Sequence, residues 1–513
     1  MRSFPVDPAS LYPTNPLFVD FLANRAELLD LFERRPSEYR AAADRRTRQP
    51  RPRTEIADAL ADYNRSIGAP AEVLHAVDAL RAPDTSCVIT GQQAGLLGGP
   101  VYTAYKILTT IRLARRLSER LAAPVVPVFW LASEDHDLTE IHRVRWVSPD
   151  GALHAIGFDL PDVRCAAECL PLSDEIRHTK DDLVKALDLD PELQNLVRPE
   201  NGDDYARWHA RIWSRLFGAD GLVLIEPRVL RPSSGAFFER ALERKDLIRS
   251  GLHAAARRLS ALGYHPSLDA EVAGSPFRIA DDGRRTRVPE DAYDPSVTYS
   301  ADAALRPVLA DALLPTVASV LGPGELAYHA QLRPVYEALD VAQPVFVSRR
   351  GYTLVSTADA ALLETAGISV AAALDPTFDP QPQIAAQVPT ELRAAFDRSR
   401  DAVRTALAPL GPIAHDADPG LEARWRQVAD RADRDISQLE ERVARAELAR
   451  NGLSIRRLRA VLESLRPAGE PQERVLSLIH PLARFGVEWL HRLPGAEHPD
   501  RAGHDVVILD EQT

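Results

Sequence analysis

The sequence predicts an α/β protein: a Rossmann-like, doubly wound parallel sheet core with helical insertions, plus a protruding α-helical coiled-coil domain. Two observations predict the sheet. Short runs rich in Val, Ile and Phe end in glycine or in charged residues, and amphipathic helical patterns fall between these runs. One observation predicts the coiled coil: apolar residues recur at spacings of three and four along residues 421–446.

The chain before the first expected strand is predicted to be helical. Residues 17–32 and 55–80 each place apolar side chains at helical spacing. Between them lies a basic, proline-interrupted run, RRTRQPRPR at 45–53, which we expect to be a solvated connector.

A βαβ unit is predicted next. Ser86–Thr90 reads as a short buried strand, residues 101–121 as an amphipathic helix, and residues 125–131 as a second strand. Further strands are expected at 221–227 and 344–350, with helical patterns between them.

The composition changes after Leu374, where a proline-rich stretch begins. A helix is expected at 392–407, followed by a longer helix with an apolar seam. One glycine costs a packed helix about 1 kcal/mol, so this helix could continue through Asn451-Gly452. The seam must pair with the 392–407 helix, with another subunit, or with both. It comprises Leu421, Trp425, Val428, Ala432, Ile436, Leu439, Val443 and Ala446.

These patterns divide the chain into three expected parts. The Rossmann-like core covers residues 1–375, with a helical insertion at about 150–215. The coiled-coil domain covers residues 390–466. The C-terminal segment, residues 471–513, is expected to pack back on the core.

The bulk composition excludes several classes of protein. A net charge of −12 over 513 residues does not indicate a nucleic-acid binder, and no stretch approaches the ~18 uninterrupted apolar residues of a membrane span. Only three cysteines, and an N-terminus without an apolar signal core, favour a reducing, cytoplasmic location. Cys165 and Cys169 have no second half of a zinc site in the sequence, so no metal site is predicted.

The stretch TGQQAGLLGGP, residues 90–100, is the first sign of a ligand site. It follows a buried strand, so it should lie at the carboxyl edge of the sheet, where α/β proteins bind ligands. Its glycines would let a ligand approach the backbone, and free N–H groups at the next helix start would favour a phosphate or carboxylate. The spacing matches neither the dinucleotide fingerprint nor a Walker A loop, so a tight turn without a ligand is the alternative.

A second polar cluster follows the next expected strand and should reach the same edge. It consists of Glu134, Asp135, His136 and Asp137. A carboxylate beside a histidine raises its basicity, as general-base catalysis requires, and these groups also suit Mg²⁺ or Zn²⁺. The alternative is a solvated acidic loop.

A third cluster begins the helix after Gly322-Pro323-Gly324. Glu325 and Tyr328 share one face of this helix. The strand at 344–348 ends in Arg349, a position suited to two hydrogen bonds with a carboxylate or phosphate. Arg306 is more typical of a surface arginine. We expect the three clusters to meet at one rim of the sheet.

These motifs resemble those of the bacillithiol biosynthesis cysteine-adding enzymes, the BshC family. The resembling segments run in order from NPLFVDFL to QERVLSLIHPLARFG, essentially the whole chain, and the GQQ turn and GPGE are distinctive. The resemblance implies a Rossmann-like core and a coiled coil that joins two copies into a homodimer. It also implies the last step of bacillithiol synthesis, in which the carboxyl of cysteine is joined to the glucosamine amine of glucosaminyl-malate.

The resemblance further implies a relation to nucleotide-dependent ligases. ATP or ADP would be the cofactor, Mg²⁺ a companion ion, and a nucleotide site would lie near the coiled coil. The chain has only four lysines, none of which stands in a KMSKS-like sequence, and no HIGH sequence occurs. Either ATP is handled differently from related ligases, or the donor is not free cysteine plus ATP.

Chemistry and resemblance together single out the site residues. An amide forms only from an activated carboxyl and a deprotonated amine, and His136 is the expected base. The malate carboxylates need cationic or N–H partners, for which Arg349 and the glycine-turn amides are candidates. We expect His136, Asp137 and Gln93 to be catalytic, Gln92, Tyr102, Lys106, Glu325, Tyr328, Gln331 and Arg349 to bind substrate, and Gly91, Gly95, Gly98 and Gly99 to bind the cofactor.

Two other functions fit the same sequence. One is a dimeric scaffold that binds a nucleotide or metabolite without turnover and presents its coiled coil to partners. The other is a Rossmann nucleotidyltransferase that acts on another sugar.

Overall fold

The computed structural model describes residues 1–12, 15–160, 165–280, 282–288, 292–495, 498 and 502–511. The chain forms two compact units. The core unit comprises Met1–Trp146, His154–Leu354 and Glu470–Thr513, and the helical unit comprises Val147–Leu153 and Val355–Gly469.

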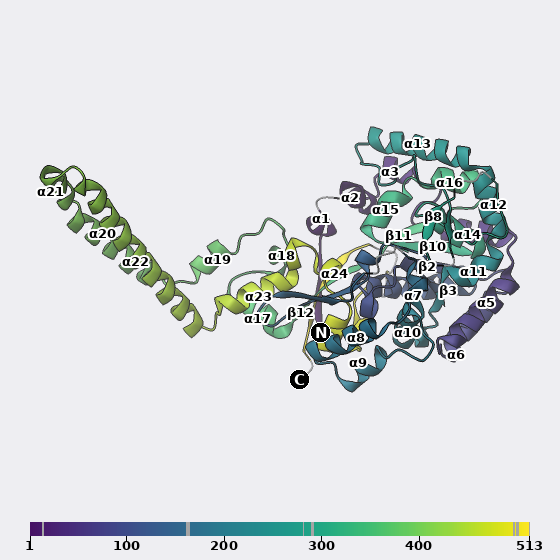
Figure 1. The fold of residues 1–513 in the computed structure, drawn as a ribbon, viewed down its shortest axis with the longest axis horizontal. Helices are drawn as coiled ribbons and strands as arrows, with labels where there is room; N and C mark the ends of the chain where they lie inside the picture. Colours follow the sequence, from purple (N-terminus) through teal and green to yellow (C-terminus); the bar gives the residue numbers. More distant parts are fainter. Residues whose placement is uncertain are drawn as a thin grey trace. The chain divides into compact units, whose positions relative to one another are not determined.

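The core unit is built on a five-stranded parallel sheet, which confirms the predicted fold class (Figure 1). The order across the sheet is β11-β10-β2-β3-β6, and each neighbouring pair is parallel. The chain winds outward from β2 to β6, then returns and winds outward on the other side from β10 to β11. The winding therefore reverses between β2 and β10, and in such sheets a ligand crevice opens at the carboxyl ends of those two strands. The strands are β2 (Ser86–Gln92), β3 (Val125–Leu131), β6 (Val223–Ile225), β10 (Thr316–Leu321) and β11 (Val345–Ser348).

Burial explains why these segments are strands. Every residue of β10 and of β11 is buried, and strands covered on both faces read as continuous apolar runs. Helix α7 (Tyr102–Leu121) packs against β2 and β3, and helix α4 (Tyr39–Arg48) packs against β10. The sequence pattern located β2, β3, β6 and β11 but not β10, because TVASVL is short and follows directly on an apolar helix.

Two helices expected to be continuous are each broken in two. The 17–32 pattern forms α2 (Pro16–Leu22) and α3 (Ala26–Leu29), separated at Asn24, whose φ is 56°. The 55–80 pattern forms α5 (Arg53–Ser66) and α6 (Ala71–Ala79), separated by Gly68 at a φ of 76°. A left-handed residue ends a right-handed helix, which periodicity alone does not reveal.

The basic run at 45–53 is not the solvated connector that we expected. Its first residues end α4, and the Arg46 side chain is fully buried. Arg46 donates to the backbone oxygens of Asp311, at 2.8 Å, and of Ala342. The Asp311 carboxylate lies 3.9 Å from the same guanidinium. This arginine therefore ties α4 to α14 (Leu305–Leu313) and the segment before β11.

Residues 143–217 leave the sheet and return to it. They form β4 (Arg143–Val147), β5 (Leu153–Gly157), α8 (Asp174–Ala186), α9 (Pro191–Leu196) and α10 (Tyr205–Phe217). Helix α10 closes the excursion, because the Trp213 ring packs edge-on against Phe129 of β3 at 5.8 Å.

The two ends of the chain meet in a second sheet. In it, β13 (His504–Leu509) pairs antiparallel with β1 (Arg2–Val6) and also borders β12 (Gly351–Ser356). Before β13, Trp489 packs edge-on against Tyr105 of α7, with ring centroids 6.4 Å apart. The C-terminal residues thus cover the helix that follows β2.

The helical unit contains a long helical hairpin. Helix α20 (Thr390–Leu407) and helix α22 (Leu421–Arg450) pack together, joined by α21 (Leu410–Ala417). The Trp425 indole donates to the Leu407 carbonyl at 2.8 Å, and Arg400 pairs with Glu440. Helix α22 does not continue through Asn451-Gly452: Gly452 adopts a φ of 82°, and α23 (Ile455–Leu465) starts anew.

The hairpin buries only part of the predicted seam. Trp425, Ile436 and Val443 are half-buried between the two helices. By contrast, Val428 and Leu439 are 48% and 55% exposed. No helix in the described part of the chain combines the length and apolar character needed to cross a bilayer.

Candidate functional site

A cavity of about 310 Å³ opens at the carboxyl ends of β2 and β10, where the winding reverses. We call it the switch-point cleft. It gathers residues from the three polar clusters, since Gln93, Asp135 and Glu325 all line it. The predicted site residues that line it are Gly91, Gln92, Gln93, Tyr102, Lys106, Glu325, Tyr328 and Arg349.

Lys106 joins the two strand ends at the floor of this cleft. Its Nζ lies 2.6 Å from Glu325 Oε2 and donates to the Gly91 carbonyl at 2.8 Å and to Gln92 Oε1 at 3.0 Å. The same Glu325 oxygen accepts the Gly322 N–H at 2.7 Å. Burial lowers the pKa of Lys106, and the charge of Glu325 opposes that shift. These three contacts match the three protons of the ammonium, so Lys106 braces the cleft.

Arg349 is also held by protein groups. Its Nη1 and Nη2 donate to the two oxygens of Glu473 at 2.9 and 2.6 Å, and the Tyr12 hydroxyl donates to the same carboxylate. Burial alone would raise the pKa of Glu473, but Arg349 outweighs it and lowers that pKa. Only the Arg349 Nε, near Gly322, has no hydrogen-bond partner among the described residues. Glu473 lies 124 residues from Arg349, and no local pattern in the sequence indicates that the two side chains pair.

Gln93 orients a carboxylate at the centre of the site. Its Nε2 donates to Asp135 Oδ2 at 2.9 Å, while the Asp137 N–H donates to Asp135 Oδ1 at 3.2 Å. Burial would raise the pKa of Asp135, but the Gln93 hydrogen bond and the charge of Arg306 hold it below its ordinary value. Asp135 is therefore ionised at neutral pH and can attract a cationic amine.

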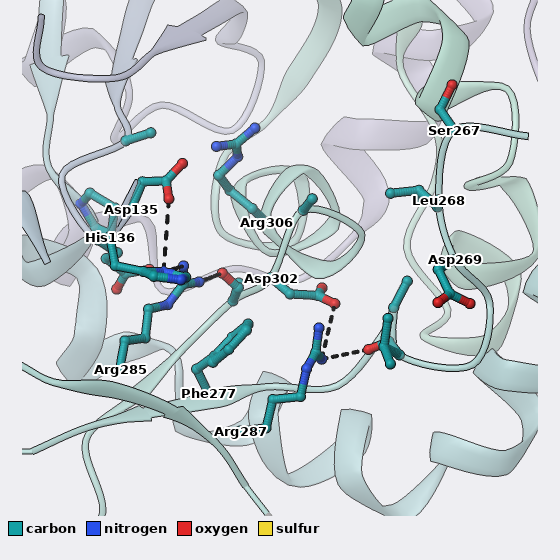
Figure 2. A pocket seen from close by; sticks show the side chains of 17 residues that line it. Asp135, His136, Ser267, Leu268, Asp269, Phe277, Arg285, Arg287, Asp302 and Arg306 are labelled. Carbon is teal, nitrogen blue, oxygen red and sulfur yellow. Dashed lines mark hydrogen bonds and ion pairs between the residues drawn. The ribbon is translucent and has the colours of Figure 1, made fainter. Parts of the chain in front are cut away.

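A second cavity, of about 300 Å³, adjoins the cleft (Figure 2). We call it the arginine chamber, after Arg285, Arg287 and Arg306 in its wall. Asp135 and Arg306 line both cavities, so they form the boundary between them. His136 lines the chamber and not the cleft. Its Nδ1 lies 3.5 Å from Arg285 Nη1 and 3.9 Å from Asp135 Oδ1.

Outside the glycine turn, two predicted residues line neither cavity. Asp137 is exposed and caps the short turn Leu138–Glu140 through the Thr139 N–H. Gln331 is fully buried. Its Oε1 accepts the Ser267 and Leu268 N–H groups at 2.7 and 2.9 Å, so Gln331 supports one wall of the arginine chamber.

The glycine turn does not offer free amides. The N–H groups of Gly95, Gly98 and Gly99 donate to carbonyls within the turn, at 3.0, 3.0 and 3.1 Å, and the Val101 N–H donates to Leu476. Gly98 and Gly99 adopt φ values of 97° and 66°. Only Gly91 of the four predicted glycines lines the cleft. Gly95, Gly98 and Gly99 form the tight turn itself, which agrees with the alternative of a turn without a ligand.

Two arginines are the main site residues that sequence reasoning did not select. Arg306 donates to the Tyr328 hydroxyl at 3.2 Å, and Arg474, in the C-terminal segment, also lines the cleft. Among the described residues, no carboxylate lies within 4 Å of either guanidinium. The sequence favours a surface position for Arg306, because the position of a residue in a helix does not reveal what that face of the helix contacts.

Comparison with known proteins decides the family. The model of the N-terminal Rossmann-like domain of bacillithiol biosynthesis BshC matches residues 4–298 and 290–350. The model of the BshC C-terminal coiled-coil domain matches residues 352–509. The chain belongs to the BshC family. The switch-point cleft and the arginine chamber are built mainly from the part that matches the Rossmann-like model of BshC.

Curated relatives match over nearly the full length of this BshC chain. A Salinibacter ruber protein is 30% identical, with 98% of this chain and 97% of the relative covered. A Geobacillus thermodenitrificans protein is also 30% identical, with 88% and 90% covered. Both are named "Putative cysteine ligase BshC". Among solved structures, Thermus thermophilus arginyl-tRNA synthetase is 14% identical, and the match covers 79% of this chain and 80% of the synthetase chain. Its TM-score of 0.17 is too low to support an argument.

Proposed function

We propose that this chain is the ligase that adds cysteine to the glucosamine amine of glucosaminyl-malate, the last step of bacillithiol synthesis, and that it acts in the cytoplasm. The names of the BshC relatives support cysteine ligation. The observation that carries the proposal is the switch-point cleft, where an ionised Asp135 and two arginines that meet no carboxylate among the described residues line one cavity.

The cleft suits an acceptor that carries carboxylates and an amine. Arg474 lines only this cavity and would bind a malate carboxylate through paired hydrogen bonds, while Arg306 lies at the boundary that the cleft shares with the arginine chamber. Asp135 attracts the amine as an ammonium and keeps it near the boundary with the arginine chamber. Gln93 acts as a positioning residue, because it touches Asp135 and fixes the direction of its carboxylate.

Carboxyl activation is the remaining demand of the reaction. Amide formation removes one oxygen from the cysteine carboxylate and two protons from the ammonium, so that oxygen must depart with an activating group. We propose that ATP supplies that group. The glycine turn does not fit a nucleotide phosphate, since its amides are used within the fold, and we assign no step to it. Among the described residues no group of three or more His, Cys, Asp or Glu side chains is arranged to hold a metal ion, so we propose that Mg²⁺ enters with the nucleotide.

The test is product formation by the purified full-length protein. We expect mass spectrometry to detect bacillithiol, with AMP or ADP, when glucosaminyl-malate, cysteine and ATP are all present. Arg474→Gln should raise KM for glucosaminyl-malate about tenfold or more, since one charge-assisted hydrogen bond is worth about 1.5–3 kcal/mol. Arg424→Gln, an exposed change in α22, is the matched control and should behave as wild type. Absence of product with every nucleotide, or an unchanged KM in Arg474→Gln, would contradict the proposal.

We also propose that the chain is a homodimer joined through the coiled coil, as the family resemblance implies. The helical hairpin supports this, because Leu421, Val428 and Leu439 of α22 are 44%, 48% and 55% exposed. Residues 421, 428 and 439 are separated by seven and eleven positions, so they lie near one face of the helix. An apolar face that the hairpin leaves uncovered is what a second copy would bury.

A further inference from the structure

We propose that the arginine chamber is a binding site for a free α-amino acid, held with its carboxyl end at the boundary with the switch-point cleft. The identity of that amino acid as cysteine rests on the proposed function. The chamber itself is argued from its size, its paired charges, its apolar wall and its shared boundary.

The chamber has the size and construction of a small-molecule site. Its volume of about 300 Å³ falls at the lower end of the range for such sites, roughly 300–1,000 Å³. Five segments distant in sequence enclose it: the loop after β3, Pro227, residues 267–273, the hairpin of β7 (Phe277–Ile279) and β8 (Arg285–Arg287), and residues 301–306 at the start of α14. Figure 2 shows Asp135 and Arg306 on one side and Leu268 and Asp269 on the other.

A carboxylate-binding group lies at one end of the chamber. Arg306 is bound by the Tyr328 hydroxyl alone among the described side chains, and no described carboxylate lies within 4 Å of it. In Figure 2 its guanidinium is directed toward Asp135 and away from Arg285 and Arg287. Those two arginines are already engaged, since they donate to the backbone carbonyls of Ala301 and Val272. The carboxylate of a ligand would therefore be bound by Arg306.

An ammonium-binding group lies in the same cavity. Glu134 is only 6% exposed and lines the chamber. It shares one partner, Arg231, with the carboxylate of Glu168. Two carboxylates thus face one guanidinium, so a ligand's ammonium would supply the second positive charge that both carboxylates need in order to ionise together. A cation site and an anion site in one cavity match the two charges of an amino acid.

Part of the chamber wall is apolar, since Leu268, Val272 and Phe277 line it beside the polar Ser267 and Asp269. The Phe277 ring lies between the guanidinium groups of Arg285 and Arg287, whose Cζ atoms are 4.2 and 4.7 Å from its centroid. This cation–π arrangement fixes the ring, and the wall suits a short, weakly polar side chain such as that of cysteine.

The shared boundary gives the amino acid its orientation. The reaction requires the carboxyl carbon of one substrate to meet the amine of the other. The two cavities have Asp135, Ala303 and Arg306 in common. An amino acid whose carboxylate is bound by Arg306 therefore presents its reacting carbon to the cleft, where the acceptor amine is attracted by Asp135.

The test measures binding to the full-length protein without turnover. L-Cysteine, cysteamine, 3-mercaptopropionate and (S)-malate are titrated under reducing conditions by calorimetry. We expect L-cysteine to bind, and cysteamine and 3-mercaptopropionate to bind about tenfold or more weakly, because each lacks one of the two charges. Failure of L-cysteine to bind, or tighter binding of (S)-malate to the chamber, would overturn the proposal.

Variants separate the two cavities. Glu134→Gln and Ala273→Leu alter only the chamber, the second by filling it at a partly exposed position where folding is tolerant. Each should weaken L-cysteine binding about tenfold and leave (S)-malate binding unchanged. Arg474 lines only the cleft, so Arg474→Gln should weaken (S)-malate binding and leave L-cysteine binding unchanged. Unchanged cysteine affinity in both chamber variants would refute this inference even if the enzyme makes bacillithiol, and cysteine binding without product would refute only the proposed reaction.

Discussion

At the scale of single residues, the partners of a charged side chain decide what it does. Arg46 and Arg349 are buried in the core unit, and Arg306 is half-buried there. Arg46 binds backbone carbonyls, and Arg349 is locked to Glu473, so both hold the fold together. Arg306 has one hydroxyl partner and lines two cavities, so it is the arginine available to a ligand. An arginine therefore stabilises the fold or remains available to a ligand, depending on which hydrogen-bond acceptors the fold places near its guanidinium.

Glu134 makes the stability of the protein depend on pH. Burial, with Arg231 opposing and Glu168 assisting, raises the pKa of Glu134 from 4.5 to about 7. Between those values the folded chain keeps a proton that the unfolded chain has lost. The stability that this group contributes therefore falls as the pH rises from 4.5 to 7.

We expect Glu134→Gln to remove that dependence. The melting temperature of the variant minus that of the wild type should increase between pH 5 and pH 8, measured by thermal unfolding in matched buffers. Glu441→Gln, at an exposed position of α22, is the control and should give a constant difference. A difference for Glu134→Gln that stays constant between pH 5 and pH 8 would show that the carboxyl is already ionised in the folded protein over that range.

At the scale of elements, the glycine turn positions the cleft without supplying its ligands. Gly95 and Gly99 touch each other so closely that a Cβ on Gly95 would lie 2.5 Å from the Gly99 Cα. This contact turns the chain sharply from β2 into α7, which brings Gln92 and Lys106 to the same floor. Backbone geometry thus accounts for these glycines, and the side chains around them form the binding surface.

We expect Gly98→Ala to destabilise the fold by about 1–3 kcal/mol, because Gly98 has a φ of 97° and a Cβ there would lie 2.8 Å from the Leu478 side chain. Gly324→Ala is the matched control. It lies in α15 (Pro323–His329), where a Cβ meets nothing within 4 Å, so alanine should leave stability unchanged or raise it by up to about 1 kcal/mol. Urea unfolding measures both. Equal stability of the two variants would contradict the structural role of the turn.

At the scale of the whole molecule, the two units have different sources of stability. The core unit encloses large apolar clusters around its sheet. In the helical unit, α20 has no fully buried residue and α22 has one, Leu448. A hairpin of that kind is stabilised by its two-helix seam and by ion pairs, and it gains most from a partner that covers its exposed apolar face.

We expect Leu439→Glu to dissociate the proposed dimer, because it would place a charge in the apolar face of α22. Light scattering after size-exclusion chromatography should show wild type at twice the chain mass of 56.5 kDa and the variant at the single mass. Gln438→Glu adds the same charge at the exposed neighbouring position and should remain dimeric. A monomeric wild type, or a dimeric Leu439→Glu, would rule out this interface.

Much of the fold could be predicted from local patterns. Local patterns predicted helix α7 and four strands, β2, β3, β6 and β11. Buried strands require apolar runs and an amphipathic helix requires helical spacing, so both can be recognised from neighbouring residues alone. The pairing of α20 with α22 also follows, since an amphipathic stripe must be covered. Strand β10 was missed because Ser319 and its neighbours lack a distinctive pattern, and their burial comes from flanking strands that sequence position does not reveal.

The sequence by itself determined the family, the parallel sheet, and the three polar clusters at its carboxyl edge, because motifs and periodicity are local properties of the chain. Only the tertiary structure decided which polar groups are paired with other protein groups and which face a cavity. Lys106 and Arg349 are ion-paired with Glu325 and Glu473 rather than free to bind a substrate. His136 lines the arginine chamber instead of the cleft, and Arg306 lines both cavities. The physical reason is that a charge's availability depends on partners more than a hundred residues away, which the fold alone brings into contact.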